Sequence, residues 1–433
     1  MRLNYFSFVV CLFLCCGTAQ AAGVSQEDVL ATWYKLILNL VRHTATYSPP
    51  VASRAFAYVG VTGYEATASG DPHLVSLSGQ LNGLKHLQKR ELGKTYDEVI
   101  VLNAAMEAAA KDFFSNTGPS GQNALAATAK SMKTKAAGGV VPDVQARSEA
   151  LGRALEKQIF RWSLSDGGAK ITNLGFPLKY ALSKEPGHWV PTNQQTLQHV
   201  PLLPNWGKNR SFAMPTGAAC TLPPPPTYSE DRNSEFFKQA QEVHDVKNGI
   251  GEDERTVARF WSDDPGLSTT PPGHWIEITL AIAARDKLPV AKTTDALARL
   301  GVGVADAFIG CWHDKYKYDY IRPVTFIKAH IDPKWDTVLI TPPFPEYPSG
   351  HSTQSGAAAT VLSAALGDGL AFDDASHEKD NLGIRHFKNF WSAANEAGIS
   401  RLYGGIHFRA AIDRGLEQGK CIGAYAVKLR TAK

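Results

Sequence analysis

The sequence contains few cysteines, and none of them lies in a recognisable motif. There are six in 433 residues, and three of these lie before residue 17. The other three, Cys220, Cys311 and Cys421, have neither the spacing of a zinc site nor that of a redox pair, and three residues cannot define a disulfide framework. One disulfide with one free thiol remains open.

A large excess of charge is also absent. The formal net charge is only +4, and the lysines and arginines do not form a long run, which argues against a nucleic-acid partner. Hydrophobic residues make up 44% of the chain, enough for a sizeable core. The length exceeds that of one typical domain, so we expect two packed units.

Only the first residues contain an extended apolar run. Arg2 precedes apolar residues 5–16, and the small-residue triplet at 19–21 follows. This order is typical of a secretory signal peptide, so we expect residues 1–21 to be cleaved after Sec-type export, giving a periplasmic or extracellular protein. A lipoprotein attached through an early cysteine is a minor alternative. No later stretch approaches the roughly 20 apolar residues of a membrane span, so we expect no transmembrane anchor.

Alternating strand patterns are scarce, and the apolar spacing is mostly helical. In residues 22–180, Ser25 with Asp28 predicts a helix start, Pro50 stands where a helix can begin, and Thr95 with Glu98 predicts the cap of a helix over 99–114. We therefore expect an all-α protein. Its N-terminal unit would be an antiparallel helical assembly.

Residues 181–233 are rich in proline and keep neither a helical nor a strand period, so we expect an irregular connection. A long decoration on one continuous domain is the alternative. A C-terminal helical domain over 234–433 should then hold helices at about 234–246, 253–261, 293–312, 349–366 and 377–397, one after a stop at 271–273, and a last one from about 406. We expect the two helical units to pack together, and a homodimer is one alternative for the assembly.

Three short blocks in the last third carry the chemistry. They are residues 315–323 (KYKYDYIRP), 348–351 (PSGH) and 400–407 (SRLYGGIH). Together they offer three cations, a helix-opening Ser-Gly and two histidines, which can surround and neutralise a tetrahedral oxyanion. We therefore predict an oxyanion site in the C-terminal bundle.

The middle block lies at a turn-to-helix junction, where free backbone N–H groups and the positive helix end point outward. The Ser349 hydroxyl and the Gly350 amide can donate to an anion there, and a side chain at 350 would block close approach. His351 would act as a general acid or base. A solvated surface charge is the alternative for each Lys or Arg taken alone.

The ordered pattern Lys-x6-Arg-Pro, Pro-Ser-Gly-His and Ser-Arg-x5-His resembles the vanadium-dependent haloperoxidase and type 2 phosphatidic acid phosphatase superfamily. The resemblance covers roughly residues 253–423. The N-terminal helical half resembles the soluble bacterial haloperoxidase-related branch more loosely.

The resemblance implies a role for each residue of the blocks. His407 would bond to the vanadium of a vanadate cofactor, His351 would handle protons at the opposite apex, and Lys315 would polarise bound peroxide. The residues that would hold the equatorial oxygens are Lys315, Arg322, Ser349, Gly350 and Arg401. The substrates would be hydrogen peroxide and a halide, with iodide or bromide favoured.

Two other functions remain open. A soluble acid phosphatase would need no cofactor, and its His407 would attack a phosphate ester to form a phosphohistidine. A non-catalytic anion-binding protein is the third alternative. Many family members place an aspartate four residues after the second histidine, but here that residue is Ala411. Asp413 should turn away from His407, so the pattern disfavours a phosphatase, whose nucleophile needs an orienting partner.

Three supporting residues follow from the same resemblance. Trp312 and Phe344 match aromatic positions that line the halide pocket, although core packing explains them equally well. Asp264 resembles a family carboxylate that pairs with Arg401, and helix capping by Asp263 or Asp264 is the alternative. The histidines outside the blocks, His43, His274 and His313 among them, are expected to be ordinary and partly buried.

Overall fold

A computed structural model describes residues 23–171, 176–177, 179–192 and 200–433. The described chain is mostly helical, which confirms the all-α prediction, and its strands form one small antiparallel sheet. The expected signal peptide lies outside the described residues. The elements are α1 (Gln26–Arg42), α2 (Pro49–Ala68), α3 (Glu98–Phe113), α4 (Pro119–Ala136), α5 (Pro142–Ser163), α6 (Gly168–Ile171), η1 (Trp206–Lys208), α7 (Glu235–Gly249), α8 (Glu252–Phe260), α9 (Thr270–Arg285), α10 (Val290–Tyr318), α11 (Pro323–His330), α12 (Gly350–Leu366), β1 (Phe372–Asp374), η2 (Glu378–Asp380), β2 (Arg385–Phe387), α13 (Phe390–Tyr403) and α14 (Arg409–Val427).

The N-terminal helices begin largely where the caps indicate. Ser25 and Asp28 form a reciprocal capping box at α1, in which the Asp28 amide donates to the Ser25 hydroxyl at 3.1 Å. The expected Thr95 cap of α3 is wrong. Asp97 caps this helix, because its carboxylate lies next to the first turn and accepts from the Ile100 amide at 2.9 Å.

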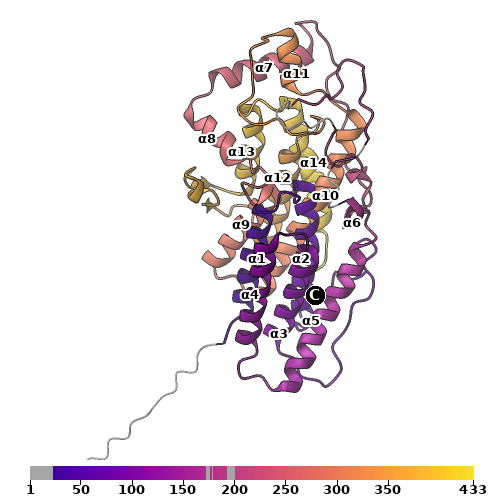
Figure 1. Ribbon diagram of the computed structural model, residues 1–433, viewed down its shortest axis with the longest axis vertical. Coiled ribbons are helices and arrows are strands. Elements are labelled where there is room, and N and C mark those ends of the chain that lie inside the picture. Colours follow the sequence, from indigo (N-terminus) through magenta and orange to yellow (C-terminus); the bar gives the residue numbers. More distant parts are fainter. Residues whose placement is uncertain (1–22, 172–175, 178, 193–199) are drawn as a thin grey trace, which may run out of the picture.

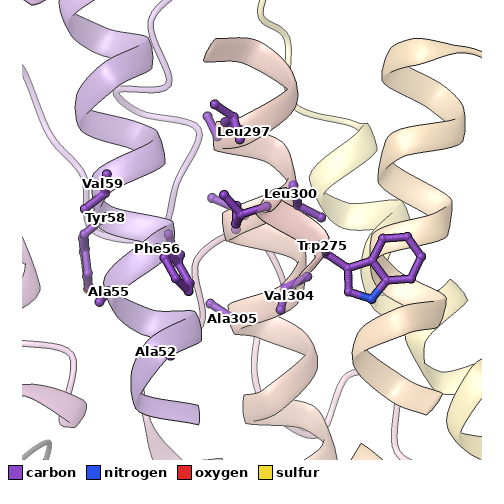
Figure 2. Packing of buried hydrophobic residues seen from close by; sticks show 14 of the residues in the cluster. Ala52, Ala55, Phe56, Tyr58, Val59, Trp275, Leu297, Leu300, Val304 and Ala305 are labelled. Carbon is purple, nitrogen blue, oxygen red and sulfur yellow. The ribbon is translucent and has the colours of Figure 1, made fainter. Parts of the chain in front are cut away.

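The two halves of the chain pack most closely where α2 crosses α10. Figure 2 shows buried apolar residues where the two helices meet, with Phe56 of α2 next to Ala305 of α10. The backbones approach closely, since a Cβ added at Gly60 would lie 2.9 Å from the Leu297 carbonyl oxygen, and one at Gly301 would lie 2.9 Å from Ala57 Cα. Glycine is therefore needed at both positions for the halves to dock.

One continuous hydrophobic cluster extends from Val29 to Leu429 through both halves. In Figure 1, helices α3, α4 and α5 occupy the lower end and α7 and α11 the upper end, with α10 between them. The C-terminal residues return to the N-terminal half, where the Val75 amide donates to the Thr431 carbonyl at 2.9 Å. The domain boundaries at 180 and 233 stay a prediction.

Two expectations about C-terminal helices are wrong. Residues 271–273 do not end a helix but lie in the first turn of α9, where proline costs no hydrogen bond. The expected helix over 377–397 begins only at Phe390. Its first part is taken by η2 and by β2, whose pairing with β1 satisfies the backbone instead.

Helices α12 and α14 pack closely, and their contact fixes the start of α12. A Cβ at Gly419 would lie 2.1 Å from the Thr353 carbonyl oxygen, so α14 has to lie directly against the first turns of α12. The Ser349 amide also donates to the Ala411 carbonyl at 3.0 Å. These contacts hold the PSGH block against the end of the SRLYGGIH block.

The irregular segment is tied to the last helix by a disulfide between Cys220 and Cys421, and Cys311 is a buried free thiol. The described part of residues 181–233 contains only the short η1 as regular structure. No helix among the described residues is long and apolar enough to cross a bilayer.

Candidate functional site

The three sequence blocks converge at one buried place in the C-terminal bundle. Lys315 lies in the last turn of α10, Arg322 directly precedes α11, Ser349 caps α12, Arg401 lies in the last turn of α13, and His407 lies between α13 and α14. Each of these five residues is at most 2% exposed. We call this group, with Gly350 and His351, the oxyanion cradle.

Lys315 connects the first block to the second. Its ammonium group donates to the carbonyls of Pro345 and Glu346 at 2.9 Å each and to that of Pro348 at 2.5 Å. Burial lowers the pKa of Lys315 to about 7. All three N–H donors of Lys315 thus bind carbonyls of the loop before Ser349. An anion can accept from Lys315 only if one of these hydrogen bonds is broken.

Arg322 connects the first block to the third. Its Nε donates to the Phe344 carbonyl at 3.0 Å, and its Nη1 donates to the Ile406 carbonyl at 2.9 Å and to His407 Nε2 at 3.2 Å. Burial lowers the pKa of Arg322 to about 10, so the guanidinium stays charged at neutral pH.

Arg401 completes the set of three cations. Its Nη2 donates to the Ala258 carbonyl at 3.1 Å, and its Nη1 lies 3.3 Å from His351 Nε2. Burial lowers the pKa of Arg401 to about 10, against the opposing effect of Asp264 and then Asp263. Three buried cations with few compensating charges favour an anionic ligand.

Ser349 and Gly350 place the start of α12 at the cradle. The Ser349 hydroxyl accepts from the Ser352 amide at 3.3 Å, as an N-cap does, which leaves its proton available to donate. The first-turn amides of α12 have no intrahelical acceptor. A Cβ added at Gly350 would be in van der Waals contact with the Trp312 ring at 3.7 Å and Lys315 Cε at 4.0 Å, so a longer side chain there would extend toward Lys315.

His407 has an orienting carboxylate, which the sequence pattern did not reveal. Its Nδ1 lies 2.8 Å from Glu346 Oε1, and the Phe408 amide donates to the same oxygen at 2.8 Å. Because Arg322 can only donate, His407 Nε2 must be the acceptor and Nδ1 must carry the proton. Burial and then Arg322 hold the pKa of His407 well below its usual range. The ring is therefore neutral and directs a lone pair into the cradle.

His407 thus has an orienting partner, contrary to the expectation drawn from Ala411 and Asp413. Ala411 is indeed buried and Asp413 exposed on α14, but Glu346 supplies the carboxylate from the loop before α12. Burial raises the pKa of Glu346 to about 7. The sequence shows only that Glu346 is the single acidic residue in the proline-rich run before Ser349. Its contact with His407 could not be predicted, because the two residues are far apart along the chain.

His351 lies at the edge of the cradle and is partly exposed. Burial and then the Arg401 charge hold its pKa well below the usual range, against the opposing effects of Asp263 and a hydrogen bond to the Ser262 carbonyl. The neutral ring can accept a proton from a ligand at the mouth of the site.

Trp312 and Phe344 contact each other beside the cations. Their ring centroids are 4.9 Å apart, and Lys315 Nζ lies 5.0 Å from the centre of the Phe344 ring. Trp312 is buried and its indole donates to the Leu202 carbonyl at 3.3 Å, whereas Phe344 is partly exposed. The pair places an apolar wall next to Lys315.

The charge of Asp264 partly opposes the lowering of the Arg401 pKa by burial, so the two groups are close. The hydrogen bonds of Arg401 nevertheless go to the Ser400 hydroxyl and the Ala258 carbonyl. The alternative of helix capping is wrong, since both aspartates follow the end of α8 and α9 is preceded by Thr269. His274 is not an ordinary partly buried histidine either. It is fully buried and contacts Asp263 Oδ2 at 2.9 Å.

The cradle fits a tetrahedral or trigonal-bipyramidal oxyanion such as phosphate or vanadate. Guanidinium groups, an ammonium group and helix N-terminal amides are the donors that such anions require. A neutral imidazole can bond to a metal or attack phosphorus through Nε2 once its hydrogen bond from Arg322 is given up. Residues of the described chain thus supply both charge compensation and a nucleophilic nitrogen.

Sequence comparisons point to one family. A family model described as the VCPO second helical-bundle domain matches residues 295–333 and 329–432, which include the cradle. Vanadium chloroperoxidase from Curvularia inaequalis is 26% identical over 211 residues, 35% of this chain. The aligned region spans only 35% of that relative's length.

Structural comparisons extend the match to almost the whole chain. The crystal structure of a bacterial vanadium-dependent iodoperoxidase is 37% identical, with a TM-score of 0.85, and the match covers 94% of this chain and 97% of that one. The apo form of a bacterial vanadium-dependent chloroperoxidase is 14% identical with a TM-score of 0.69 over 88% of this chain and 94% of that one, which shows a shared fold alone. The extent and identity of the first match establish that this chain belongs to the vanadium-dependent haloperoxidase superfamily, a superfamily of enzymes.

Proposed function

We propose that the protein is a vanadate-dependent haloperoxidase that oxidises a halide with hydrogen peroxide to hypohalous acid. The observation that carries this proposal is the neutral His407 ring, whose Nε2 lone pair lies among three buried cations, 3.2 Å from Arg322 Nη1. Vanadate bound there would supply a Lewis acid that activates hydrogen peroxide toward a halide.

The protein residues would bind and orient. His407 would ligate vanadium through Nε2, while Arg322 and Arg401 would neutralise the oxygens. Ser349 and the Gly350 amide would donate to the same oxygens from the start of α12. His351 would take a proton from hydrogen peroxide, because its ring is neutral when its pKa is held well below the usual range.

Iodide or bromide is the halide that we propose. A soft, weakly hydrated halide loses little on leaving water, and the wall of Trp312 and Phe344 would exclude water beside Lys315. The iodoperoxidase named in the structural comparison supports the same choice.

An acid phosphatase remains the second candidate, and Glu346 favours it. The 2.8 Å contact between Glu346 Oε1 and His407 Nδ1 is the arrangement that would orient a histidine nucleophile and stabilise its positive charge in a phosphohistidine. No cofactor would be required in that reaction.

One experiment separates the two candidates. Protein freed of vanadate with a chelator is incubated with or without orthovanadate, and oxidation of iodide and of bromide by hydrogen peroxide is measured beside hydrolysis of a chromogenic phosphate ester. We expect halide oxidation only with vanadate, absent in His407→Ala and retained in His386→Ala, whose side chain is 75% exposed. Ester hydrolysis that vanadate inhibits, without halide oxidation, would establish the phosphatase instead.

A third result has its own meaning. Tight binding of phosphate or vanadate with neither activity would identify a non-catalytic anion-binding protein. Because His407→Ala retains the three cations, its residual anion affinity separates loss of binding from loss of chemistry.

We also propose that the protein is exported through residues 1–21. The residue pattern of this segment supports the proposal, and so does the Cys220–Cys421 disulfide, since disulfides persist in oxidising compartments. Expression of the full chain in a secreting host should yield a protein that begins near Ala22, as read by intact mass. Retention of residues 1–21 on the exported or purified protein would contradict it.

A further inference from the structure

A second group of chemically active side chains lies outside the cradle. Asp263 follows α8, His274 lies on α9, and His377 directly precedes η2. His274 Nδ1 lies 2.9 Å from Asp263 Oδ2, and His377 Nε2 lies 3.0 Å from Asp263 Oδ1. All three are buried, and one ligand atom from each lies within 4.8 Å of the others. We call these three residues the Asp-His cluster.

Each imidazole of the cluster has a carboxylate at its other nitrogen. His274 Nε2 lies 2.7 Å from Asp374 Oδ2, and His377 Nδ1 lies 3.0 Å from Asp380 Oδ2. Metal-binding histidines have this surrounding, because a carboxylate that accepts from one ring nitrogen fixes the tautomer and directs the other nitrogen's lone pair to the metal. The two outer aspartates thus direct both rings toward Asp263.

Aromatic contacts fix the planes of the two rings. Trp261 stacks on His274 with a centroid distance of 4.7 Å, and the edge of Phe260 meets His377 at 5.1 Å. Rings held in this way present their nitrogens without further loss of side-chain freedom on binding, which lowers the cost of forming a metal site.

The charges of the cluster require a positive partner. Carboxylates can only accept, so each contact between a ring nitrogen and Asp263 has to contain either a proton or a shared cation. Three aspartates, Asp263, Asp374 and Asp380, face the rings, and Arg42 offsets one of them through its 2.7 Å contact with Asp380. Two protons or one divalent cation compensate the remaining charge equally well.

We propose that Asp263, His274 and His377 bind a divalent transition-metal ion, with zinc the ion that this ligand set suits best. Two imidazole nitrogens and one carboxylate oxygen are among the common ligands of zinc. In tetrahedral coordination such ligand atoms lie about 3.3 Å apart. The contacts of 2.9 and 3.0 Å involve the two different oxygens of Asp263, and the three ligand atoms lie within 4.8 Å of one another. Zinc binding would therefore draw the two rings together around one oxygen of Asp263.

A cavity beside the cluster would give an ion access to it. A cavity of about 1050 Å³ between α1, α9 and residues 373–379 is lined by Asp374, Ser376 and Glu277 among others. Glu277 lies close enough to interact electrostatically with His274, Asp263 and His377. A water molecule from the cavity side, or the Glu277 carboxylate after a change of its side-chain conformation, would complete four-coordination.

The proposed metal site would be structural and would support the cradle from behind. It would fix the turn at residues 261–264, from which the Ser262 carbonyl accepts from His351 and Asp264 interacts with Arg401. It uses none of the residues of the cradle and does not depend on the proposed function.

The test uses the whole chain purified without a polyhistidine tag. Chelator-treated protein is titrated with ZnCl2 by calorimetry in two buffers of different ionisation enthalpy, and Co²⁺ is added separately as a spectroscopic probe. We expect one Zn²⁺ per chain, release of about two protons on binding, and a visible Co²⁺ absorption band. Zinc should also raise the midpoint of thermal unfolding.

Variants assign the binding to this cluster. His377→Gln and Asp263→Asn should each lower zinc affinity at least tenfold, whereas the exposed control His386→Ala and the cradle variant His407→Ala should keep it. Circular dichroism reports whether each variant folds. Should a cluster variant not fold, the wild-type metal content and Co²⁺ band decide the question.

Two outcomes would overturn the proposal. One is the absence of stoichiometric zinc and of a Co²⁺ band in the wild-type protein, together with nitrogen-15 spectra in which all four ring nitrogens of His274 and His377 are protonated. The other is zinc affinity that folded His377→Gln and Asp263→Asn leave unchanged. Either result would show that protons alone, without a metal ion, hold the two histidines and their aspartates together.

Discussion

Glu346 Oε1 accepts a hydrogen bond from His407 Nδ1 at 2.8 Å, although 61 residues separate the two along the chain. The second oxygen of Glu346, Oε2, is buried with no hydrogen-bond partner among the described residues. The carboxyl group therefore serves one imidazole and the Phe408 amide, and it sets which nitrogen of His407 faces the cradle.

Replacing Glu346 should weaken the binding of vanadate. Glu346→Ala removes the acceptor that fixes the His407 tautomer, so we expect a loss of vanadate affinity of about 10- to 100-fold. Glu346→Gln keeps an acceptor oxygen and should lose less. Calorimetric titration with orthovanadate measures both, with exposed Asp413→Asn as the control. Equal affinities of Glu346→Ala and the wild type would show that Glu346 does not position His407.

Anion affinity should fall as the pH rises through about 7. Burial lowers the pKa of Lys315 to about 7 and raises that of Glu346 to about 7. Above this pH, Lys315 loses a positive charge and Glu346 gains a negative one, and both changes disfavour an anion. Sulfate is a suitable probe because its own charge does not change between about pH 5 and pH 9.

The matched variants separate the two groups. The slope of sulfate affinity against pH reports the number of protons taken up when the anion binds. Lys315→Met and Glu346→Gln should each reduce this number by up to about one. Calorimetry over this pH range gives the slopes. A wild-type affinity that stays flat from about pH 6 to pH 8 would show that neither group titrates in that window.

Arg322→Lys should not be conservative. The guanidinium Nε donates to the Phe344 carbonyl, and Nη1 donates to both the Ile406 carbonyl and His407 Nε2. One ammonium group cannot reproduce this geometry. We expect vanadate affinity to fall at least tenfold, or about 1.4 kcal/mol. Arg409→Lys, at a partly exposed pair with Glu242, is the control. Full retention of affinity in Arg322→Lys would mean that only its charge matters.

Gly301→Ala should destabilise the whole fold by separating α2 from α10. The added Cβ would lie 2.9 Å from both Ala57 Cα and the Phe56 carbonyl oxygen, and backbone atoms cannot move aside cheaply. We expect the free energy of unfolding to fall by about 1–3 kcal/mol. Gly249→Ala, with no atom within 4 Å, should be neutral or stabilising by about 0.4–1 kcal/mol. Denaturant titration measures both, and equal stability would mean that the helices adjust.

Local signals determined much of the fold and most of the cradle. The capping box at Ser25 and Asp28, the helix start at Ser349 and the three sequence blocks were readable, because each depends on residues a few positions apart. Helix ends were less predictable. Residues 377–389 follow a helical spacing but do not form the expected helix. Part of their backbone pairs β2 with β1 instead, and the His377 side chain contacts Asp263.

The sequence by itself determined that the chain would be helical and which cations, glycine and histidines could hold an oxyanion. Only the tertiary structure decided that Glu346 is the carboxylate bound to His407 and that Lys315 donates to the loop at 345–348. It also placed His274 between Asp263 and Asp374. The physical reason is that burial and contact between distant segments set protonation and hydrogen bonding. Neither is encoded in the spacing of residues along the chain.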